Sequence, residues 1–290
     1  MTNALTVDVE DYFHVAAFAR VVRREHWDSY PRRVGRNTTR LLELLAEQGV
    51  RATFFVLGWV AEKLPRLIQQ IGQAGHRIGC HGYAHEMIYR NSPEEFRADL
   101  RKAKGLLEDT LGVPVRSFRA PSYSITAESL WALEILAEEG FQYDSSIFPI
   151  VHDNYGIADA PRFPYWKVLN SGLRIQEFPP STVRLFGINV PVAGGGYLRL
   201  LPCAVTSWAI RRINRVDKEP AMIYLHPWEI DPDQPRIAAP LLSRFRHYQN
   251  LDSTEDKMKR LLSQFSFAPM EEVLAAHFGE ESSLNERQRP

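Results

Sequence analysis

Two cysteines, Cys80 and Cys203, are all that this sequence offers for disulfide bonds, so a disulfide framework does not hold the chain together. No apolar run reaches transmembrane length, because charged residues interrupt the longest candidates within a few positions. The segment Met1–Val9 is too short and too acidic at its end to be a signal peptide. We therefore expect a cytoplasmic location without an integral membrane segment, and association with a membrane through a partner protein stays open.

The chain has a formal net charge of zero at pH 7, because 35 Lys and Arg residues balance 35 Asp and Glu residues. A neutral chain has no global field that attracts nucleic acid or an acidic membrane. Basic residues do cluster at Arg20–Arg24 and Arg211–Arg215, and we interpret both clusters as solvated helix faces. We therefore expect no nucleic acid partner, whereas a homo-oligomer is compatible with the sequence.

Apolar segments with strand character alternate with amphipathic segments that have the period of a helix. Such alternation indicates parallel strands joined by crossover helices, so we predict an α/β fold. The predicted strands are Leu5–Val9, Arg51–Leu57, Arg77–Cys80, Val115–Phe118, Phe141–Tyr143 and Ala221–Leu225, and the predicted helices are Asn37–Gln48, Trp59–Ala74, Pro93–Thr110, Thr126–Glu138 and Pro202–Val216.

We expect one catalytic domain over residues 1–278, because no linker, repeat or low-complexity tract interrupts this pattern. Its last part, Pro240–Phe278, has mostly helical character. Residues 279–290 are polar and are predicted to be a frayed tail.

One region departs from the alternation. The segment Ser146–Pro180 is rich in proline and is predicted to be irregular, and Val183–Leu200 is predicted to be β structure with a turn at Gly194–Gly196. Long irregular segments inside a domain are usually functional loops. We therefore interpret the region around residues 146–200 as an insertion that forms a substrate-facing wall.

Acidic residues gather at the end of the first predicted strand. Residues i and i+2 of a strand share a face, so Asp8 and Glu10 point together, while Asp11 points elsewhere unless the strand has already ended. Several carboxylates on a buried strand repel one another unless a cation is present. This favours a metal site over the alternative that they cap the next segment or lie in water.

Two histidines, His81 and His85, follow the third predicted strand at a spacing of i, i+4. A helical turn or a tight loop would direct both imidazoles to one point, which suits a divalent metal with open coordination positions. Such a pair on its own is more often solvated, but the preceding strand and the carboxylates favour the metal site. Cys80, directly before His81, is interpreted as a small buried residue and not as a nucleophile.

Three more polar residues follow predicted strands. His226 could act as a general acid if an acidic or arginine-linked network tunes it. Arg119 could hold a catalytic carboxylate by a bidentate pair, and Asp144 could orient or charge-stabilise His226. The alternatives are a structural histidine and ordinary salt bridges. All these strand ends can converge on one rim, which is where α/β barrels form their active sites.

Five short motifs that contain these residues follow one another along the chain. Together they resemble the motifs of the polysaccharide deacetylases of carbohydrate esterase family 4, the NodB-homology group. Each motif is weak alone, but five in order at strand ends are specific together, and they span most of the chain. The stretches Asp8–Phe13 and His226–Glu229 further resemble the subgroup found beside exosortase A exopolysaccharide clusters. The motifs are Thr6-Val7-Asp8, His81 with His85, Arg119-Ala120-Pro121, Asp144-Ser145-Ser146 and Leu225-His226.

The resemblance implies a distorted (β/α) barrel with about seven parallel strands. It implies a metal held by one carboxylate and two histidines, with Asp8 as general base and His226 as general acid. The common family motif has two adjacent aspartates, the second of which binds the metal, whereas here Val9 follows Asp8. Relatives with an Asp-x-Asp pattern indicate Glu10 as the ligand, as the strand geometry does, and Asp11 is its rival.

The implied activity is the metal-assisted hydrolysis of N-acetyl groups on a polysaccharide or oligosaccharide, in exopolysaccharide or cell-wall polymer synthesis. Zinc is the favoured metal, although Co, Ni, Mn and Fe also suit a site of two histidines and one carboxylate. Tyr123 is expected to supply a cleft wall or a backbone N–H for the oxyanion. Trp228, Trp166 and Tyr165 are candidates for stacking on sugar rings.

Two other functions stay open. The first is an amide hydrolase of the same fold that acts on a non-sugar substrate such as a ureide or a cyclic imide. The second is a catalytically silent carbohydrate-binding protein of a polymer-export complex. The presence of Asp8, His81, His85 and His226 together argues against the silent protein.

Overall fold

One curved sheet forms the centre of the computed structural model, which describes residues 1–152, 155–192 and 194–279. Seven neighbouring strands of this sheet are mutually parallel, and the eighth is an antiparallel edge strand. The predicted distorted (β/α) barrel with about seven parallel strands is therefore confirmed. In spatial order the strands are β10 (Met222–Leu225), β1 (Thr2–Val9), β2 (Thr53–Val56), β3 (Arg77–Cys80), β4 (Ser117–Phe118), β5 (Tyr143–Asp144), β7 (Arg174–Glu177) and β6 (Tyr165–Val168).

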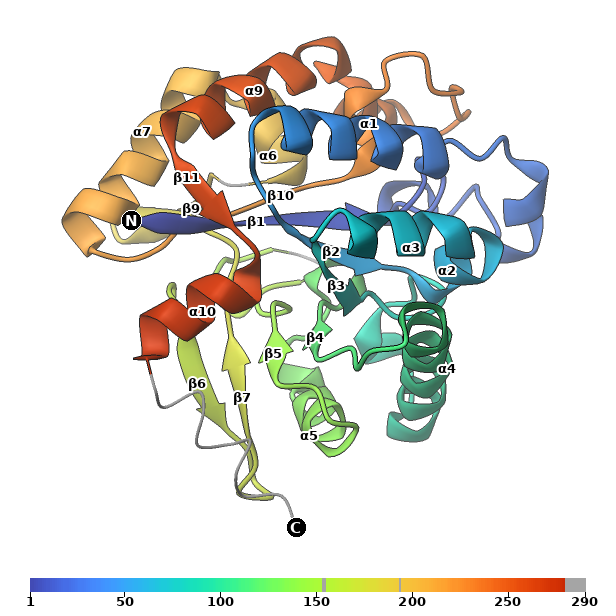
Figure 1. Cartoon of the computed structure of the whole chain (residues 1–290), viewed down its shortest axis with the longest axis horizontal. Helices are drawn as coiled ribbons and strands as arrows, with labels where there is room; N and C mark the ends of the chain where they lie inside the picture. Colours follow the sequence, from blue (N-terminus) through green and yellow to red (C-terminus); the bar gives the residue numbers. More distant parts are fainter. Residues whose placement is uncertain (153–154, 193, 280–290) are drawn as a thin grey trace.

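Helices join the parallel strands and lie around the outside of the sheet (Figure 1). The predicted helix Trp59–Ala74 is in fact two helices that meet at Pro65. Proline lacks the backbone N–H that a helix interior needs and disfavours the helical conformation of the preceding residue. The helices in this part are α1 (Val34–Glu47), α2 (Gly58–Lys63), α3 (Pro65–Gln73), α4 (Pro93–Leu111) and α5 (Trp131–Glu138).

Helix α4 was predicted correctly because its sequence carries recognisable capping residues at both ends. The side chain of Ser92 accepts a hydrogen bond from the backbone of Glu95, whose own side chain accepts one from the backbone of Ser92. Pro93 occupies the first turn, and Gly112 ends the helix with φ of 69°. The apolar stripe of this helix is buried, and it consists of Phe96, Leu100, Ala103 and Leu107.

The region around residues 146–200 is more regular than predicted. Strands β6 and β7 lie inside the segment that was expected to be irregular, and they extend the main sheet. The predicted β structure is present as a hairpin of β8 (Thr182–Leu185) and β9 (Ile188–Pro191).

The predicted turn at the glycine run of this region was wrong, because α6 (Gly195–Leu200) begins there. Gly194 lies directly against the ring of Tyr224 in β10, where a Cβ atom would come within 2.0 Å of the ring. The glycine therefore permits a close approach between two backbone segments and does not form a hairpin turn.

The last part of the described chain is mostly helical, as expected, with one exception. Strand β11 (Ser266–Ala268) was missed, and it pairs in parallel with the start of β1. None of the helices in the described ranges is both long and apolar enough to cross a bilayer. The predicted polar tail lies outside the described residues from position 280 onwards. The helices are α7 (Cys203–Arg212), which continues as a π-helical turn, α8 (Leu241–Tyr248), α9 (Thr254–Gln264) and α10 (Met270–Phe278).

Helix α10 packs against the starts of the parallel strands. Its buried residues Met270, Val273 and Leu274 form an apolar cluster with Ala4, Phe55, Phe178 and Met222. Beside this cluster, Glu271 accepts hydrogen bonds from the hydroxyls of Thr53 and Ser117, at the first residues of β2 and β4. Helix α10 therefore covers part of the N-terminal side of the sheet, and the chemistry-bearing residues lie at the C-terminal ends of the strands.

Candidate metal centre and active site

The three carboxylates at the end of β1 lie in two different environments. Asp8 and Glu10 are buried on the side of the histidine pair. The carboxylate of Asp11 instead accepts hydrogen bonds from the backbone N–H groups of Tyr12, Arg33 and Val34, at 3.0, 2.7 and 2.9 Å. Asp11 therefore caps the start of α1 and is turned away from the histidines.

A tight loop after β3 carries His81 and His85. Gly82 has φ of 71° and His85 has φ of 53°, so the loop turns back on itself and is not a helical turn. The Nδ1 atom of His81 donates to the carbonyl of Arg119 at 2.7 Å, which leaves its Nε2 atom unprotonated in the neutral ring. Burial lowers the pKa of His81 to about 4, so the ring is neutral at physiological pH and available as a ligand.

The three predicted metal ligands lie together. The candidate ligand atoms of Glu10, His81 and His85 are all within 4.8 Å of one another. The Oε2 atom of Glu10 is 2.9 Å from Nε2 of His85, yet it is buried without a partner of hydrogen-bond geometry among the described residues. Although burial opposes the ionisation of Glu10, the charge of His85 and its close contact with the carboxylate hold the pKa of Glu10 well below the usual range. One carboxylate and two imidazoles with a poorly satisfied buried oxygen fit a divalent cation.

Arg119 fixes the position of Asp8. Its guanidinium is completely buried, and Nη1 donates to Oδ1 of Asp8 at 2.6 Å and to the hydroxyl of Thr6 at 2.8 Å. The other two nitrogens bond to Ser145, so the expected bidentate pair is in fact a single charged hydrogen bond. The second oxygen of Asp8 remains directed toward His226, whose Nε2 atom is 3.9 Å away.

His226 is held by a residue that the sequence interpretation did not assign. Its Nδ1 atom is 3.2 Å from Oε1 of Glu229, which is completely buried and also contacts the buried Arg199 at 3.3 Å. Burial opposes the protonation of His226, but the hydrogen bond to Glu229 and the charges of Glu10, Glu229 and Asp8 outweigh it and raise the pKa to about 9. The spacing of Glu229 three residues after His226 was the available signal.

The partner expected for His226 was Asp144, and the structure gives that contact to Glu229 instead. Asp144 accepts a hydrogen bond from Ser146 at 2.5 Å and pairs with the buried Glu177. Burial raises the pKa of both carboxyl groups, so the pair retains a proton between its members. A direct catalytic role of Asp144 remains a prediction.

The predicted substrate-binding aromatics are more buried than expected. Tyr123 is 5% exposed, and its backbone N–H donates to Ala120 at 3.0 Å, so that N–H is already occupied. Trp228 is 4% exposed and stacks on His226 with ring centroids 5.1 Å apart, so it supports the histidine from behind. Trp166 packs against Phe278 of α10 and not at the strand ends that carry the site.

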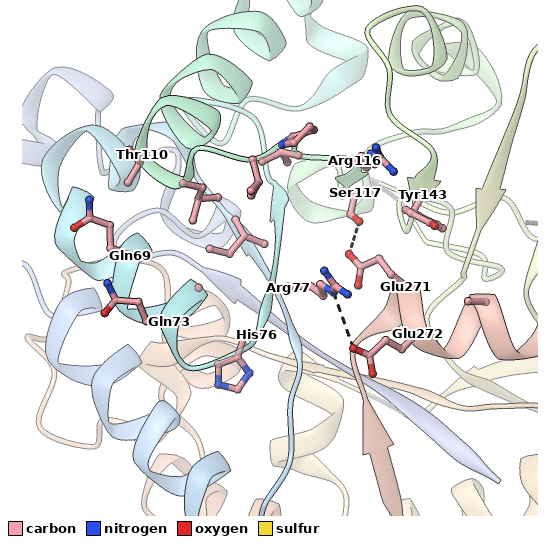
Figure 2. A pocket seen from close by; sticks show the side chains of 17 residues that line it. Gln69, Gln73, His76, Arg77, Thr110, Arg116, Ser117, Tyr143, Glu271 and Glu272 are labelled. Atoms are coloured by element: carbon pink, nitrogen blue, oxygen red, sulfur yellow. Dashed lines mark hydrogen bonds and ion pairs between the residues drawn. The ribbon is translucent and has the colours of Figure 1, made fainter. Parts of the chain in front are cut away.

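A large cavity lies away from these groups. It has a volume of about 830 Å³, and Figure 2 shows that it is lined by the start of β3 at Arg77, the start of β4 at Ser117, and Glu271 of α10. A smaller cavity of about 160 Å³ borders His85 and is walled by Trp27 and Met87. The chemistry of the side chains, not cavity size, therefore locates the candidate active site.

The fold and the site together define the class of the molecule, a NodB-like (β/α) barrel whose strand ends hold a candidate metal centre. Comparison with family models narrows this class, because residues 26–143 match the polysaccharide deacetylase model. Residues 145–275 match a domain of unknown function (DUF3473). The part of the chain that carries His81, His85 and Arg119 therefore matches the polysaccharide deacetylase family, in agreement with the resemblance of the sequence motifs. The exosortase-associated subgroup remains a prediction.

Individual relatives agree with this assignment over part of their length. The chain is 35% identical over 98 residues to a peptidoglycan-N-acetylglucosamine deacetylase of Bacillus cereus, covering 33% of this chain and 36% of that protein. It is 32% identical over 166 residues to a peptidoglycan deacetylase of Helicobacter pylori, covering 56% and 54%. The chain therefore spans between about a third and about half of these two relatives.

A solved structure supports the fold over nearly the whole chain. A Mycobacterium smegmatis protein that carries a provisional polysaccharide deacetylase name superposes with a TM-score of 0.61 at 22% identity. The match covers 96% of this chain and 90% of that chain. At this level of identity the similarity establishes the architecture and not the activity.

Proposed function

We propose that this protein is a metal-dependent hydrolase that removes N-acetyl groups from a polysaccharide or oligosaccharide. One observation carries the proposal: Glu10, His81 and His85 cluster within 4.8 Å, and two proton-transfer groups lie beside them. The names of the curated relatives support an acetylated sugar polymer as substrate. Zinc as the metal, a role in exopolysaccharide synthesis and a cytoplasmic location are further parts of this proposal.

The site residues have different roles in the proposed reaction. Glu10, His81 and His85 would hold a divalent cation, which supplies a Lewis acid for the acyl carbonyl. Asp8, with one oxygen held by Arg119, keeps the other free to take a proton from the attacking water.

His226 is the proposed acid. Its Nε2 atom lies 3.9 Å from Oδ2 of Asp8, so the two groups face one volume from different strands. Glu229 keeps the proton-bearing Nδ1 side of the ring fixed, which directs Nε2 toward the departing sugar amine. The proton that Asp8 removes from water and the proton that His226 delivers to nitrogen balance the hydrolysis of an amide.

The two alternative functions make different demands on the site. A hydrolase of ureides or cyclic imides would use the same residues on a smaller substrate. A silent carbohydrate-binding protein would have no need of the paired base and acid. The pair of Asp8 and His226, each held by its own charged partner, therefore favours an enzyme.

The deciding experiment combines a metal titration with an assay of acetate release. Protein purified without chelator is analysed for metal, stripped, and reloaded with Zn, Co, Ni, Mn or Fe before incubation with N-acetylated chito-oligomers, a ureide and a cyclic imide. We expect one bound ion per chain and metal-dependent release of acetate from the oligomers alone. Hydrolysis of the ureide or imide alone would identify the first alternative, and oligomer binding without hydrolysis would identify the second.

A further inference from the structure

Helix α8 presents an apolar face to solvent. Leu241, Leu242 and Phe245 are 81%, 60% and 60% exposed, and their spacing of i, i+1 and i+4 places them on one side of the helix. The helix is anchored from its other side, where His247 is buried. An isolated exposed leucine needs no explanation, but three large apolar side chains on one short helix form a surface that is adapted to contact.

The charges beside this face are of one sign. Arg236, Arg244 and Arg246 are exposed, and none of them lies within ion-pair distance of a carboxylate in the described parts of the chain. Some other surface arginines are paired, as Arg40 is with Glu255 and Arg51 with Glu272. The sequence from Gln234 to Asn250 contains no Asp or Glu at all. The overall neutrality of the chain thus conceals a cationic rim around the apolar face of α8.

A buried side chain anchors the C-terminal end of this helix. The buried guanidinium of Arg199 donates to the carbonyls of Arg246, His247 and Gln249, and so satisfies the C-terminal end of α8. A preformed face loses less conformational entropy on binding than a face that must first be ordered.

The same helix is connected to the catalytic centre through stacked rings. The ring of His247 lies 4.1 Å from that of Trp228, which in turn stacks on His226. His247 also packs on Phe18, in the turn that follows the carboxylates of β1. The inner side of α8 is therefore linked to His226 through two successive ring contacts.

We propose that α8 docks the protein on an anionic lipid bilayer, with Leu241, Leu242 and Phe245 in the headgroup region and the arginines at the lipid phosphates. An apolar helix face rimmed by arginine is the pattern of an interfacial helix. A second copy fits less well, because a two-fold contact would bring the arginines of both faces together. This inference rests on the proposed function and adds a substrate class to it, an N-acetylated saccharide carried on a lipid.

The first experiment measures co-sedimentation with vesicles of phosphatidylcholine alone and with phosphatidylglycerol added at about a third of the lipid. We expect the wild-type protein to bind the anionic vesicles and to be released as salt is raised, since screening weakens contacts with phosphates. A variant with Leu241→Ser, Leu242→Ser and Phe245→Ser should lose at least roughly tenfold in partitioning. A matched control carries Val113→Ser, Val168→Ser and Val216→Ser, which are equally exposed positions away from α8, and should bind like the wild type.

The second experiment measures acetate release from a soluble chito-oligomer and from the same oligomer anchored to lipid in anionic vesicles. The α8 variant should match the wild type on the soluble oligomer, which also shows that it folds, and should fall behind on the anchored one. Absence of vesicle binding, or equal binding by the variant, would overturn the proposal. So would a wild-type dimer in light scattering that the variant converts to monomer. A protein that binds vesicles but deacetylates neither substrate would instead overturn the proposed function and leave the docking surface standing.

Discussion

Adjacent carboxylates at the end of β1 show how local geometry separates residues of similar chemistry. Glu10 is drawn into the histidine cluster, whereas the oxygens of Asp11 are already occupied by three backbone N–H groups. The sequence left the two as rivals, because strand periodicity alone does not reveal where the strand ends. The donors that occupy Asp11 come partly from residues 33 and 34, far along the chain, and no local pattern predicts them.

Exchanging each carboxylate for its amide tests this division. Glu10→Gln should weaken metal binding by more than the roughly 10–100-fold that loss of an outer hydrogen bond causes, because a charged ligand is removed. Asp11→Asn should keep metal affinity and reduce the free energy of unfolding by about 1 kcal/mol, since one of its cap acceptors becomes a donor. Isothermal titration with metal and denaturant unfolding measure the two effects. The reverse pattern would make Asp11 the ligand.

A second residue-scale prediction concerns the group that positions His226. Glu229→Gln keeps an oxygen near Nδ1 but removes its charge, so kcat on an acetylated oligosaccharide should fall roughly tenfold or more. KM and metal content should stay near the wild-type values, because Glu229 contacts neither the metal ligands His81 and His85 nor solvent. The matched control is Asp144→Asn, the same exchange of a carboxylate for an amide in the buried pair of Asp144 and Glu177. If Asp144→Asn lowers kcat more than Glu229→Gln, Asp144 regains the role first assigned to it.

Among the elements, those with strong end signals were predicted well and those made by backbone pairing were not. Helix α4 carries its capping box and terminal glycine in the sequence, so its extent was predicted to within a residue. Strand β11 has three residues and owes its existence to pairing with β1, which is invisible in any local window. The same reason accounts for β6 and β7, which lie in a segment whose prolines suggested irregular structure.

Helix α10 covers part of the end of the barrel opposite the site, and its buried leucine tests how much this packing contributes to stability. Leu274 is completely buried among Phe55, Phe178 and Met222. Leu274→Ala should lower the free energy of unfolding by about 2–5 kcal/mol, through lost burial and the cavity left behind. Leu173→Ala removes the same atoms from a half-exposed site and should cost far less. Equal effects in urea denaturation would mean that α10 is not part of the cooperative core.

His76, between α3 and β3, should make stability depend on pH. Burial, with a contribution from Arg51, lowers its pKa to about 4, and its Nδ1 atom accepts a hydrogen bond from the N–H of Ala52. The unfolded chain therefore binds more protons than the folded one between about pH 6.5 and pH 4, so stability is present above this window and is lost as pH falls through it.

His76→Asn retains an acceptor for Ala52 but cannot titrate. The midpoint of thermal unfolding should consequently decline less steeply for this variant than for the wild type as pH falls from about 6.5 to 4. Other buried histidines, such as His14, titrate in both proteins and cancel in the comparison. Parallel curves would show that His76 is protonated in the folded state as readily as in the unfolded chain.

Over the whole molecule, the sequence predicted the rim on which the site lies but not the connections within it. Parallel strands order their C-terminal ends at one edge, so Asp8, His81, Arg119 and His226 could be grouped from their positions alone. The contacts between them depend on side-chain directions that sequence spacing does not specify. Glu229 as the partner of His226, and the single hydrogen bond from Arg119 to Asp8, belong to this second kind.

The pairing of β1 has a consequence for how the protein is made. This strand is synthesised before the other strands of the sheet, and seven of its eight residues are buried in the finished fold. Of its three neighbours, only β2 is synthesised soon afterwards, whereas β10 and β11 follow near the far end of the chain. Sheets that depend on such distant pairings form slowly and leave apolar edges open in the meantime. The catalytic rim is therefore completed only after Leu225 and His226 have been translated, and the nascent chain must keep the free edges of β1 from other partners until then.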